Sequence, residues 1–324
     1  MNNFSQQQQK IRSAASRLLA DGTVRFVIGW APTRFAERTT VLFAHTEAEA
    51  QALVWNAHCT AALGKYLLDH RLADYAVGIV ARGCESRMIN RLLTDHQIWR
   101  ERVYILGAPC PGMDAERCAG CRERAPVVWD ELLWDADGMP ETGGRQDAAP
   151  TNLDEATIAD VGAGLALPAV GAACSRPLDT DTSLRSRFFR AEAVEGLSAA
   201  EKFSYWDEVY AKCIRCYACR QACPVCSCRA CYVDMDRQGF QGKQHSAADN
   251  RVFGVTRAFH VADRCVECGE CERVCPMGLP ILGQTQKLIK EIEALTGEAY
   301  VQGMDAEEEN FLGAFDLDDK DDFL

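Results

Sequence analysis

Eight cysteines in the C-terminal part of this chain repeat one spacing twice, and a spacing of this kind points to metal chemistry. Each copy reads Cys-x2-Cys-x2-Cys-x3-Cys-Pro, and the copies start at Cys213 and Cys265. Three thiolates on such a loop can reach one 4Fe-4S cluster, while the cysteine before proline reaches the other cluster. The pattern therefore predicts two crossed ligand sets. The first site comprises Cys213, Cys216, Cys219 and Cys275, and the second site comprises Cys265, Cys268, Cys271 and Cys223.

Zinc sites and disulfides are the competing interpretations of these cysteines. Zinc is disfavoured because its four ligands usually come as more widely spaced pairs. Disulfides are disfavoured because 17 cysteines is an odd number and the first residues contain no apolar run typical of a secretion signal. We expect a cytoplasmic chain with reduced thiols. A membrane span is not expected either, since the sequence has no apolar stretch of about 18 residues.

Three further cysteines, Cys226, Cys228 and Cys231, lie between the two motifs. One interpretation is a further cluster, with Cys174 or Cys59 as its fourth ligand. The other is that they are buried thiols packed beside the first two clusters. The spacing favours neither interpretation.

Four cysteines in the first half of the chain form another candidate site. Cys84 and Cys110 each follow a strand-like run, and open α/β sheets place ligands at the carboxyl ends of such strands. Cys118 and Cys121 follow as a CxxC pair, and nearby proline and glycine residues supply the bends that convergence requires. From spacing alone this third site could hold a 4Fe-4S cluster or zinc, or the four cysteines could be core residues without a ligand.

The elements that position these cysteines predict two kinds of domain. Strand-like runs at 24–29, 41–44, 76–81 and 103–107 alternate with helical patterns, one opening at Thr46 and extending to about Tyr66, another carrying Met88 and Leu92. This alternation indicates an α/β domain with a mostly parallel or mixed sheet. The cysteine-dense part is expected to be an α+β dicluster ferredoxin-like domain.

The predicted domain bounds follow changes in composition. Residues 1–135 form the α/β domain, 136–197 a linker rich in Gly, Ala and Pro, 198–297 the ferredoxin-like domain and 298–324 an acidic tail. A capping box at Ser198 and Glu201 opens a helix that leads to the first motif, and Gly297 should end a helix over 282–295. The tail could be a docking segment or a solvated chain end.

The N-terminal cysteines stand in a pattern that resembles a known family. The segments are Arg82-Gly83-Cys84-Glu85-Ser86-Arg87, Ile105 to Gly112 and Cys118-Ala119-Gly120-Cys121. They resemble the beta subunit of deazaflavin-reducing hydrogenase and its relatives in formate dehydrogenases, over roughly residues 20 to 135. The resemblance implies an α/β domain with FAD and a 4Fe-4S cluster held by Cys84, Cys110, Cys118 and Cys121.

The resemblance also implies partners and carriers. It points to a subunit of a larger complex with a hydrogenase, a formate dehydrogenase or a heterodisulfide-reductase-like protein. Its electrons would pass between one-electron clusters and a two-electron carrier such as a nicotinamide or deazaflavin coenzyme, with ferredoxin as a further possible partner. No stretch stands out as FAD-binding, since Gly162-Ala163-Gly164 lacks the third glycine of a dinucleotide fingerprint.

Other chemistry finds less support in the sequence. The net charge of −12 argues against nucleic acid, whose binding draws on basic patches. The six histidines show no paired metal spacing, and no nucleophile elbow or P-loop is present. We therefore expect an oxidoreductase subunit that transfers electrons, with a flavin-free adaptor of several clusters as the alternative and a purely structural iron–sulfur scaffold as a third hypothesis.

Overall fold

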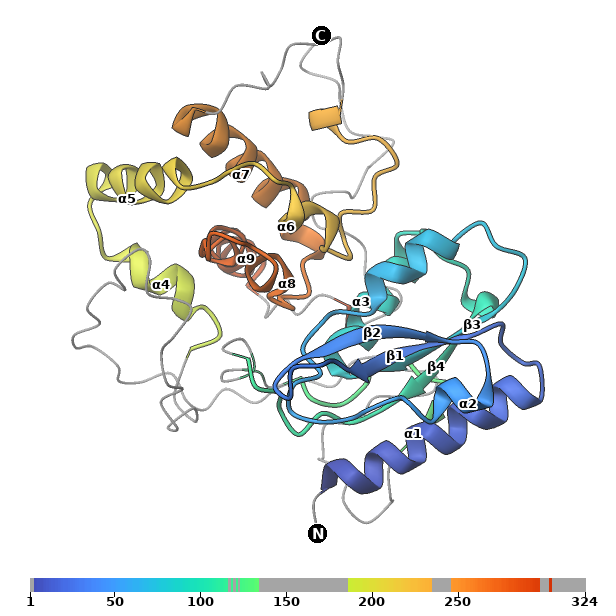
Figure 1. The fold of residues 1–324 in the computed structure, drawn as a ribbon. Helices are drawn as coiled ribbons and strands as arrows, with labels where there is room; N and C mark the ends of the chain where they lie inside the picture. Colours follow the sequence, from blue (N-terminus) through green and yellow to red (C-terminus); the bar gives the residue numbers. More distant parts are fainter. Residues whose placement is uncertain are drawn as a thin grey trace, which may run out of the picture.

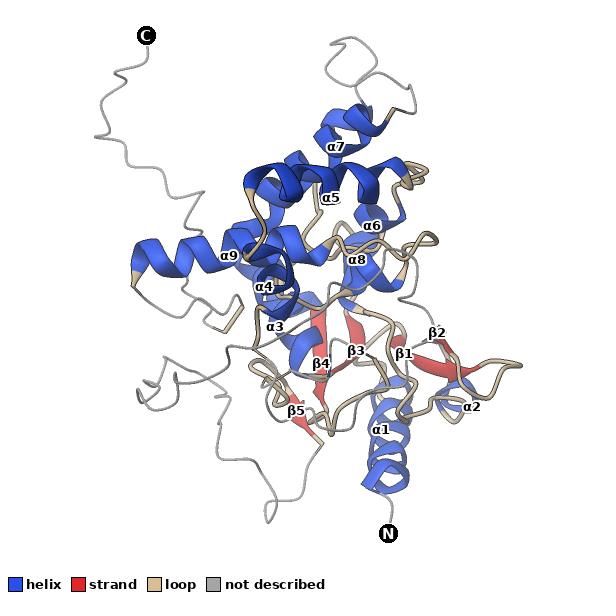
Figure 2. Cartoon of the chain, turned by 90° about the vertical axis from the view of Figure 1, so that its left-hand side faces the viewer, coloured by secondary structure: helices blue, strands red, loops and turns tan. Residues whose placement is uncertain are grey.

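The computed structural model describes residues 3–115, 118, 121, 123–133, 186–234, 246–297 and 303–304. Within them the sheet with helix α1 lies on one side of the molecule, and helices α4 to α9 gather on the other (Figures 1 and 2). No helix in these ranges is long and apolar enough to cross a membrane.

The N-terminal part is built on a five-stranded mixed sheet, as predicted. The strands are β1 (Val27–Pro32), β2 (Thr39–Ala44), β3 (Val77–Ala81), β4 (Val103–Gly107) and β5 (Glu131–Leu132), in the order β2-β1-β3-β4-β5. The pair β1 and β2 is antiparallel, while β1, β3, β4 and β5 run parallel. The carboxyl ends of β3 and β4 are therefore neighbours, which brings the chain after Ala81 close to the chain after Gly107.

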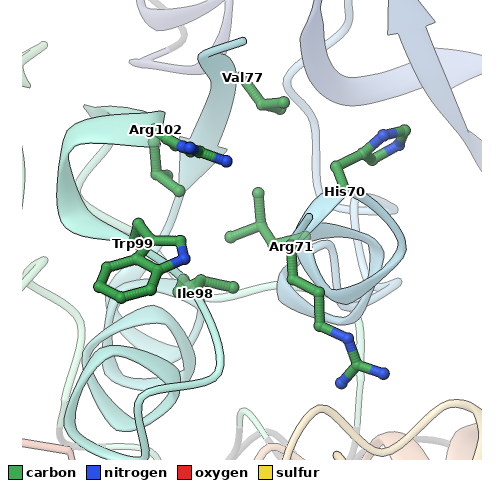
Figure 3. Close-up of a pocket in the computed structure, with 8 residues that line it drawn as sticks. His70, Arg71, Val77, Ile98, Trp99 and Arg102 are labelled. Atoms are coloured by element: carbon green, nitrogen blue, oxygen red, sulfur yellow. The ribbon is translucent and has the colours of Figure 1, made fainter. Parts of the chain in front are cut away.

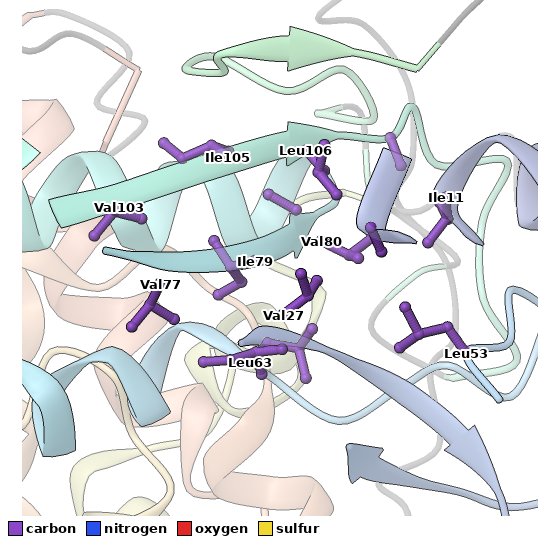
Figure 4. Packing of buried hydrophobic residues seen from close by; sticks show 14 of the residues in the cluster. Ile11, Val27, Leu53, Leu63, Val77, Ile79, Val80, Val103, Ile105 and Leu106 are labelled. Carbon is purple, nitrogen blue, oxygen red and sulfur yellow. The ribbon is translucent and has the colours of Figure 1, made fainter. Parts of the chain in front are cut away.

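Helices cover this sheet and close its core. They are α1 (Asn3–Ala20), α2 (Glu47–Ala50), α3 (Gly83–Thr94) and the 3-10 turns η1 (Gly64–His70) and η2 (Arg100–Arg102). Figure 4 shows Ile11 of α1 beside strand residues such as Val80 and Leu106, all of them buried. Strand β3 is buried along its whole length, as a parallel strand covered on both faces should be.

The predicted helix from Thr46 to about Tyr66 is wrong. Thr46 does cap a helix, but α2 ends at Ala50. Beyond it the Asn56 side chain accepts a hydrogen bond from the backbone N–H of His58 at 2.9 Å, a local bond that competes with helix formation. Trp55 also turns into the core, where it packs edge-on against Trp30 at 5.7 Å between ring centroids.

The regular elements in the described residues of the C-terminal part are all helices, joined by turns and loops. Its elements are α4 (Phe189–Glu195), α5 (Ala199–Ala211), α6 (Ala218–Gln221), η6 (Tyr232–Asp234), α7 (Ala247–Val261), η7 (Ala262–Arg264), α8 (Glu270–Arg273) and α9 (Leu282–Thr296). The capping box at Ser198 is confirmed, as is the end of α9 at Gly297, which has φ 74°. Among the residues that the structure describes in this part there is no strand, so the expected α+β character is not confirmed.

Ion pairs hold α4 against the last helix of this part, although α4 lies in the range predicted as linker. Arg187, just before α4, pairs with Glu293 of α9 at 2.6 Å. Glu195, the last residue of α4, pairs with Lys287 at 2.6 Å and Lys290 at 2.7 Å, and these bonds lower the pKa of its carboxyl group. Most of the predicted linker and of the acidic tail lies outside the described residues.

Candidate iron–sulfur sites

The two cysteine motifs adopt the same backbone conformation. In each, the third and fifth residues have positive φ: 49° at Arg215 and 60° at Tyr217, against 53° at Glu267 and 68° at Gly269. The short helices α6 and α8 follow at once. Left-handed residues of this kind turn backbone N–H groups toward the inside of a loop, where they can face an anion. The repeat in the sequence is thus a repeat in structure.

Backbone N–H groups donate to the cysteine sulfurs inside these loops. The N–H of Arg215 donates to Sγ of Cys213 at 3.4 Å, and that of Glu267 donates to Sγ of Cys265 at the same distance. Leu279 donates to Sγ of Cys275 at 3.5 Å. Such donors stabilise negative charge on sulfur, which a thiolate bound to iron carries. The donor groups therefore fit an iron–sulfur cluster.

The residues of the first site come together from both motifs. Cys213 and Cys219 contact the apolar cluster of Val209, Leu279 and Ile281, and Cys275 of the second motif contacts the same cluster. Burial raises the pKa of Cys219, and the neighbouring thiolates of Cys213, Cys275 and Cys216 raise it further. All four cysteines of the first site are therefore near one another.

The second site likewise combines cysteines of both motifs. Burial raises the pKa of Cys271 to about 12, with contributions from Cys223 and Cys219. Burial likewise raises the pKa of Cys265, with Cys223 as the next cause. Cys223 of the first motif thus lies beside two cysteines of the second. Iron would displace any proton on these buried thiols when it binds, because the thiolate is the form of cysteine that ligates metal.

Cys268, the remaining residue of the second site, lies toward the N-terminal part. It contacts a small buried cluster formed by Ala62, Met88 and Val266. Cys84 of the third site contacts that same cluster. The second and third sites are therefore neighbours across the boundary between the two parts of the chain, where α3 and α8 approach each other (Figure 1).

The cysteines proposed for the third site lie near the carboxyl ends of β3 and β4. Cys84 lies in the first turn of α3, and Cys110 follows β4. Burial raises the pKa of Cys110 to about 11, and Cys118 raises it further. Cys118 also raises the pKa of Cys121, although burial is the larger cause. A Cβ on Gly83 would lie 2.4 Å from the carbonyl oxygen of Glu123, so glycine is needed for this loop to approach α3.

Two buried arginines flank this third site, and the sequence analysis did not assign them a role. Arg82 is buried and forms an ion pair with the buried Glu85. It also lies over the ring of Trp30 at 4.7 Å, and its charge faces Cys84 and Cys110. Arg87, also buried, faces Cys121. Both arginines lie in the segment around Cys84 that carries the family resemblance. That resemblance is the feature of the sequence that could have identified them.

The other cysteines do not gather into one site in the described residues. The thiol of Cys226 is hydrogen-bonded to Cys223, and this hydrogen bond lowers the pKa of Cys223. Cys228 is exposed, and Cys231 lies beside Arg220. Cys59 is buried in the core, and burial raises its pKa to about 11. Cys174 lies outside the described residues, among which no three His, Cys, Asp or Glu side chains are placed to hold a single metal ion.

A hollow in the N-terminal part does not fit FAD (Figure 3). It is lined by Leu67, His70, Arg71, Val77, Ile98, Trp99, Arg102 and Val103. It lies at the start of β3 and β4 rather than at their carboxyl ends, where open α/β sheets place ligands. Arg71 already donates to the carbonyl oxygen of Ser227 at 3.2 Å, and Arg102 to that of Ala73.

Comparisons with known proteins match two kinds of protein to this chain. Residues 209–279 match the model of a 4Fe-4S dicluster domain. The F420-dependent formate dehydrogenase subunit beta of Methanocaldococcus jannaschii is 30% identical over 122 residues, which are 38% of this chain and 30% of that protein. The subunit beta of F420-dependent formate dehydrogenase 1 from Methanococcus maripaludis is 37% identical over 108 residues, 33% of this chain and 27% of that protein.

The matched segments thus span about a third or less of the length of these curated relatives. The resemblance predicted from the sequence is confirmed, both for the formate dehydrogenase beta subunits and for the dicluster domain behind it.

Proposed function

We propose that this chain is the iron–sulfur electron-transfer subunit of a multi-subunit oxidoreductase. The observation that carries the proposal is the shared contact of Cys84 and Cys268 with Ala62, Met88 and Val266. It supports a direct route from a cluster in the α/β part to a cluster in the ferredoxin-like part. Electrons would cross between the two parts through a few packed side chains, without a third protein.

The proposed order of clusters is third site, second site, first site. The second site adjoins the third through Cys268, and it adjoins the first because Cys219 and Cys271 lie close together. At the far end Cys216 is exposed, as is Ile214 beside it in the same loop. This end would face the redox partner, since a cluster near the surface can exchange electrons with a docked protein.

Polar contacts hold the two parts in this arrangement. Lys65 Nζ donates to the carbonyl oxygen of Cys226 at 2.8 Å. Arg71 donates to the carbonyl oxygen of the next residue, Ser227. These bonds support a fixed separation between the second and third sites, which a relay requires.

The carriers and partners are part of the proposal. The relatives are named as F420-dependent formate dehydrogenase subunits, which favours a deazaflavin coenzyme as the two-electron carrier and a formate-dehydrogenase-like partner. A hydrogenase or a heterodisulfide-reductase-like protein remains the alternative partner. The resemblance implies FAD as the group that would divide electron pairs, and no described residue is assigned to it.

Rapid reduction kinetics test the relay. The full chain, loaded with clusters and freed of oxygen, is mixed with a limiting one-electron donor, and the clusters are followed by EPR on frozen samples. We expect electrons that enter the cluster of the first site to reach the cluster of the third site. In a Cys84→Ser variant, the two clusters of the ferredoxin-like part should still be reduced, but the EPR signal of the third cluster should be absent. If the third cluster in the unaltered chain is reduced only as fast as electron exchange between separate protein molecules allows, the proposed relay is wrong. A flavin-free adaptor would show the relay but bind no FAD.

A further inference from the structure

Arg257 is buried between the two cluster sites of the ferredoxin-like part. It lies on α7, which packs against both α5 and α9, and only 4% of its surface is exposed. Its Nη2 donates to the carbonyl oxygen of Cys219, a residue of the first site, at 3.2 Å. Arg257 lies outside both cysteine motifs, so their spacing does not identify it.

The described residues offer this charge little neutralisation. No carboxylate among them forms an ion pair with Arg257, and its buried Nε has no hydrogen-bond partner in this part of the chain. Burying an uncompensated guanidinium is costly. A chain that keeps such a group needs negative charge close by.

The negative charge near Arg257 comes from cysteines of both sites. Burial alone would lower the pKa of the guanidinium, but the thiolates of Cys223, Cys271 and Cys226, and then Cys219, raise it well above its ordinary value. In return Arg257 lowers the pKa of Cys219 and of Cys271. One cation therefore faces ligands of the first site and of the second.

We propose that Arg257 is the shared counter-charge of the two clusters, and that it raises the reduction potential of both. A cluster becomes more negative when it takes up an electron, so a cation held beside it favours the reduced form. Arg257 thus acts indirectly, because the charge of its one side chain changes the reduction potentials of two clusters that its neighbours bind. This inference rests on the proposed cluster binding by the two motifs.

Arg251 on the same helix provides a matched control. It forms an ion pair with Asp207 and lies over the ring of Phe203, which is itself exposed. A guanidinium that is partly in water is screened, so its removal should have little effect on a buried cluster. Replacing either arginine removes one positive charge from α7, and the two variants differ in where that charge lies.

The experiment measures the midpoint potentials of both clusters by EPR-monitored redox titration of the full chain. Arg257→Gln should shift the reduction equilibrium of each cluster about tenfold toward the oxidised form, which is about 59 mV for a one-electron couple. Arg257→Met, which is also neutral, should do the same, whereas Arg257→Lys and Arg251→Gln should leave the potentials near those of the unaltered chain. Potentials in Arg257→Gln and Arg257→Met that match those of Arg251→Gln would overturn the proposal.

Iron content decides the case in which the neutral variants do not assemble. If both lose about eight irons while Arg257→Lys keeps as many irons as the unaltered chain, the positive charge itself is required, which supports the proposal. If Arg257→Lys loses its iron equally, the shape of arginine matters rather than its charge, and the proposal fails. An unaltered chain without these irons would instead refute the cluster binding on which the inference rests.

Discussion

Replacing Gly254 of α7 with alanine should destabilise the ferredoxin-like part. An ideal Cβ at this position would lie 2.0 Å from Oη and 2.1 Å from Cζ of Tyr210, far inside van der Waals contact. Tyr210 is 2% exposed, and its hydroxyl group is bonded to Gln284 of α9, so the ring has little room to move away. Helices α5 and α7 would have to separate next to the first site.

Overpacking of this kind costs about 1–3 kcal/mol. For a unit of about 100 residues, each kcal/mol lowers the midpoint of thermal unfolding by about 4–8 °C, so we expect a drop of at least about 4 °C. The assay follows the loss of the visible cluster absorbance during heating at a fixed rate without oxygen. Gly196→Ala is the control, because no atom lies within 4 Å of its added Cβ.

A double-mutant cycle separates this clash from other effects of the methyl group. Tyr210→Leu removes the ring that the methyl group would meet, so Gly254→Ala should cost less in that background than in the unaltered chain. Equal costs in both backgrounds, or an unchanged midpoint for Gly254→Ala, would refute the packing of α5 against α7 described above.

Three further substitutions test the ligand assignments. Cys223→Ser should perturb the EPR signal of the cluster held by Cys265, Cys268 and Cys271, and a loss confined to the other signal of the module would contradict the crossed assignment. Cys84→Ser should lower the iron content by about four atoms and leave about eight, whereas an unchanged content would remove the third site. Cys228→Ser should leave the iron content unchanged because this thiol is exposed and the thiol of Cys226 is hydrogen-bonded to Cys223 instead. A loss of about four irons would reveal a further cluster.

The sequence was most informative where the spacing of residues itself determines the geometry. The crossed exchange of Cys223 and Cys275 could be predicted because the loop conformation is local and the cysteine before proline must leave it. Strands β1, β2, β3 and β4 could be predicted from their apolar runs, whereas the two-residue strand β5 was not predicted. The meeting of Cys84 and Cys110 followed from the adjacency of two strand ends.

Features that depend on contacts between distant segments could not be predicted. The apolar pattern after Thr46 predicts a longer helix, yet Trp55 and Cys59 are buried by the fold of the whole N-terminal part. Arg257 looks like an ordinary helix residue until α7 is placed between two cysteine loops. The packing of Cys84 and Cys268 against the same buried cluster brings together residues that are far apart in the chain, and no local pattern encodes it.

The number of irons, acid-labile sulfides and flavins per chain tests the central claim most directly. The protein is to be purified without oxygen from its native host. The proposal predicts about twelve irons with an equal number of sulfides, and one FAD if the flavin implied by the resemblance is bound. About eight irons without flavin would contradict the third site and leave a dicluster ferredoxin with a docking domain. Zinc in place of iron would contradict the account as a whole.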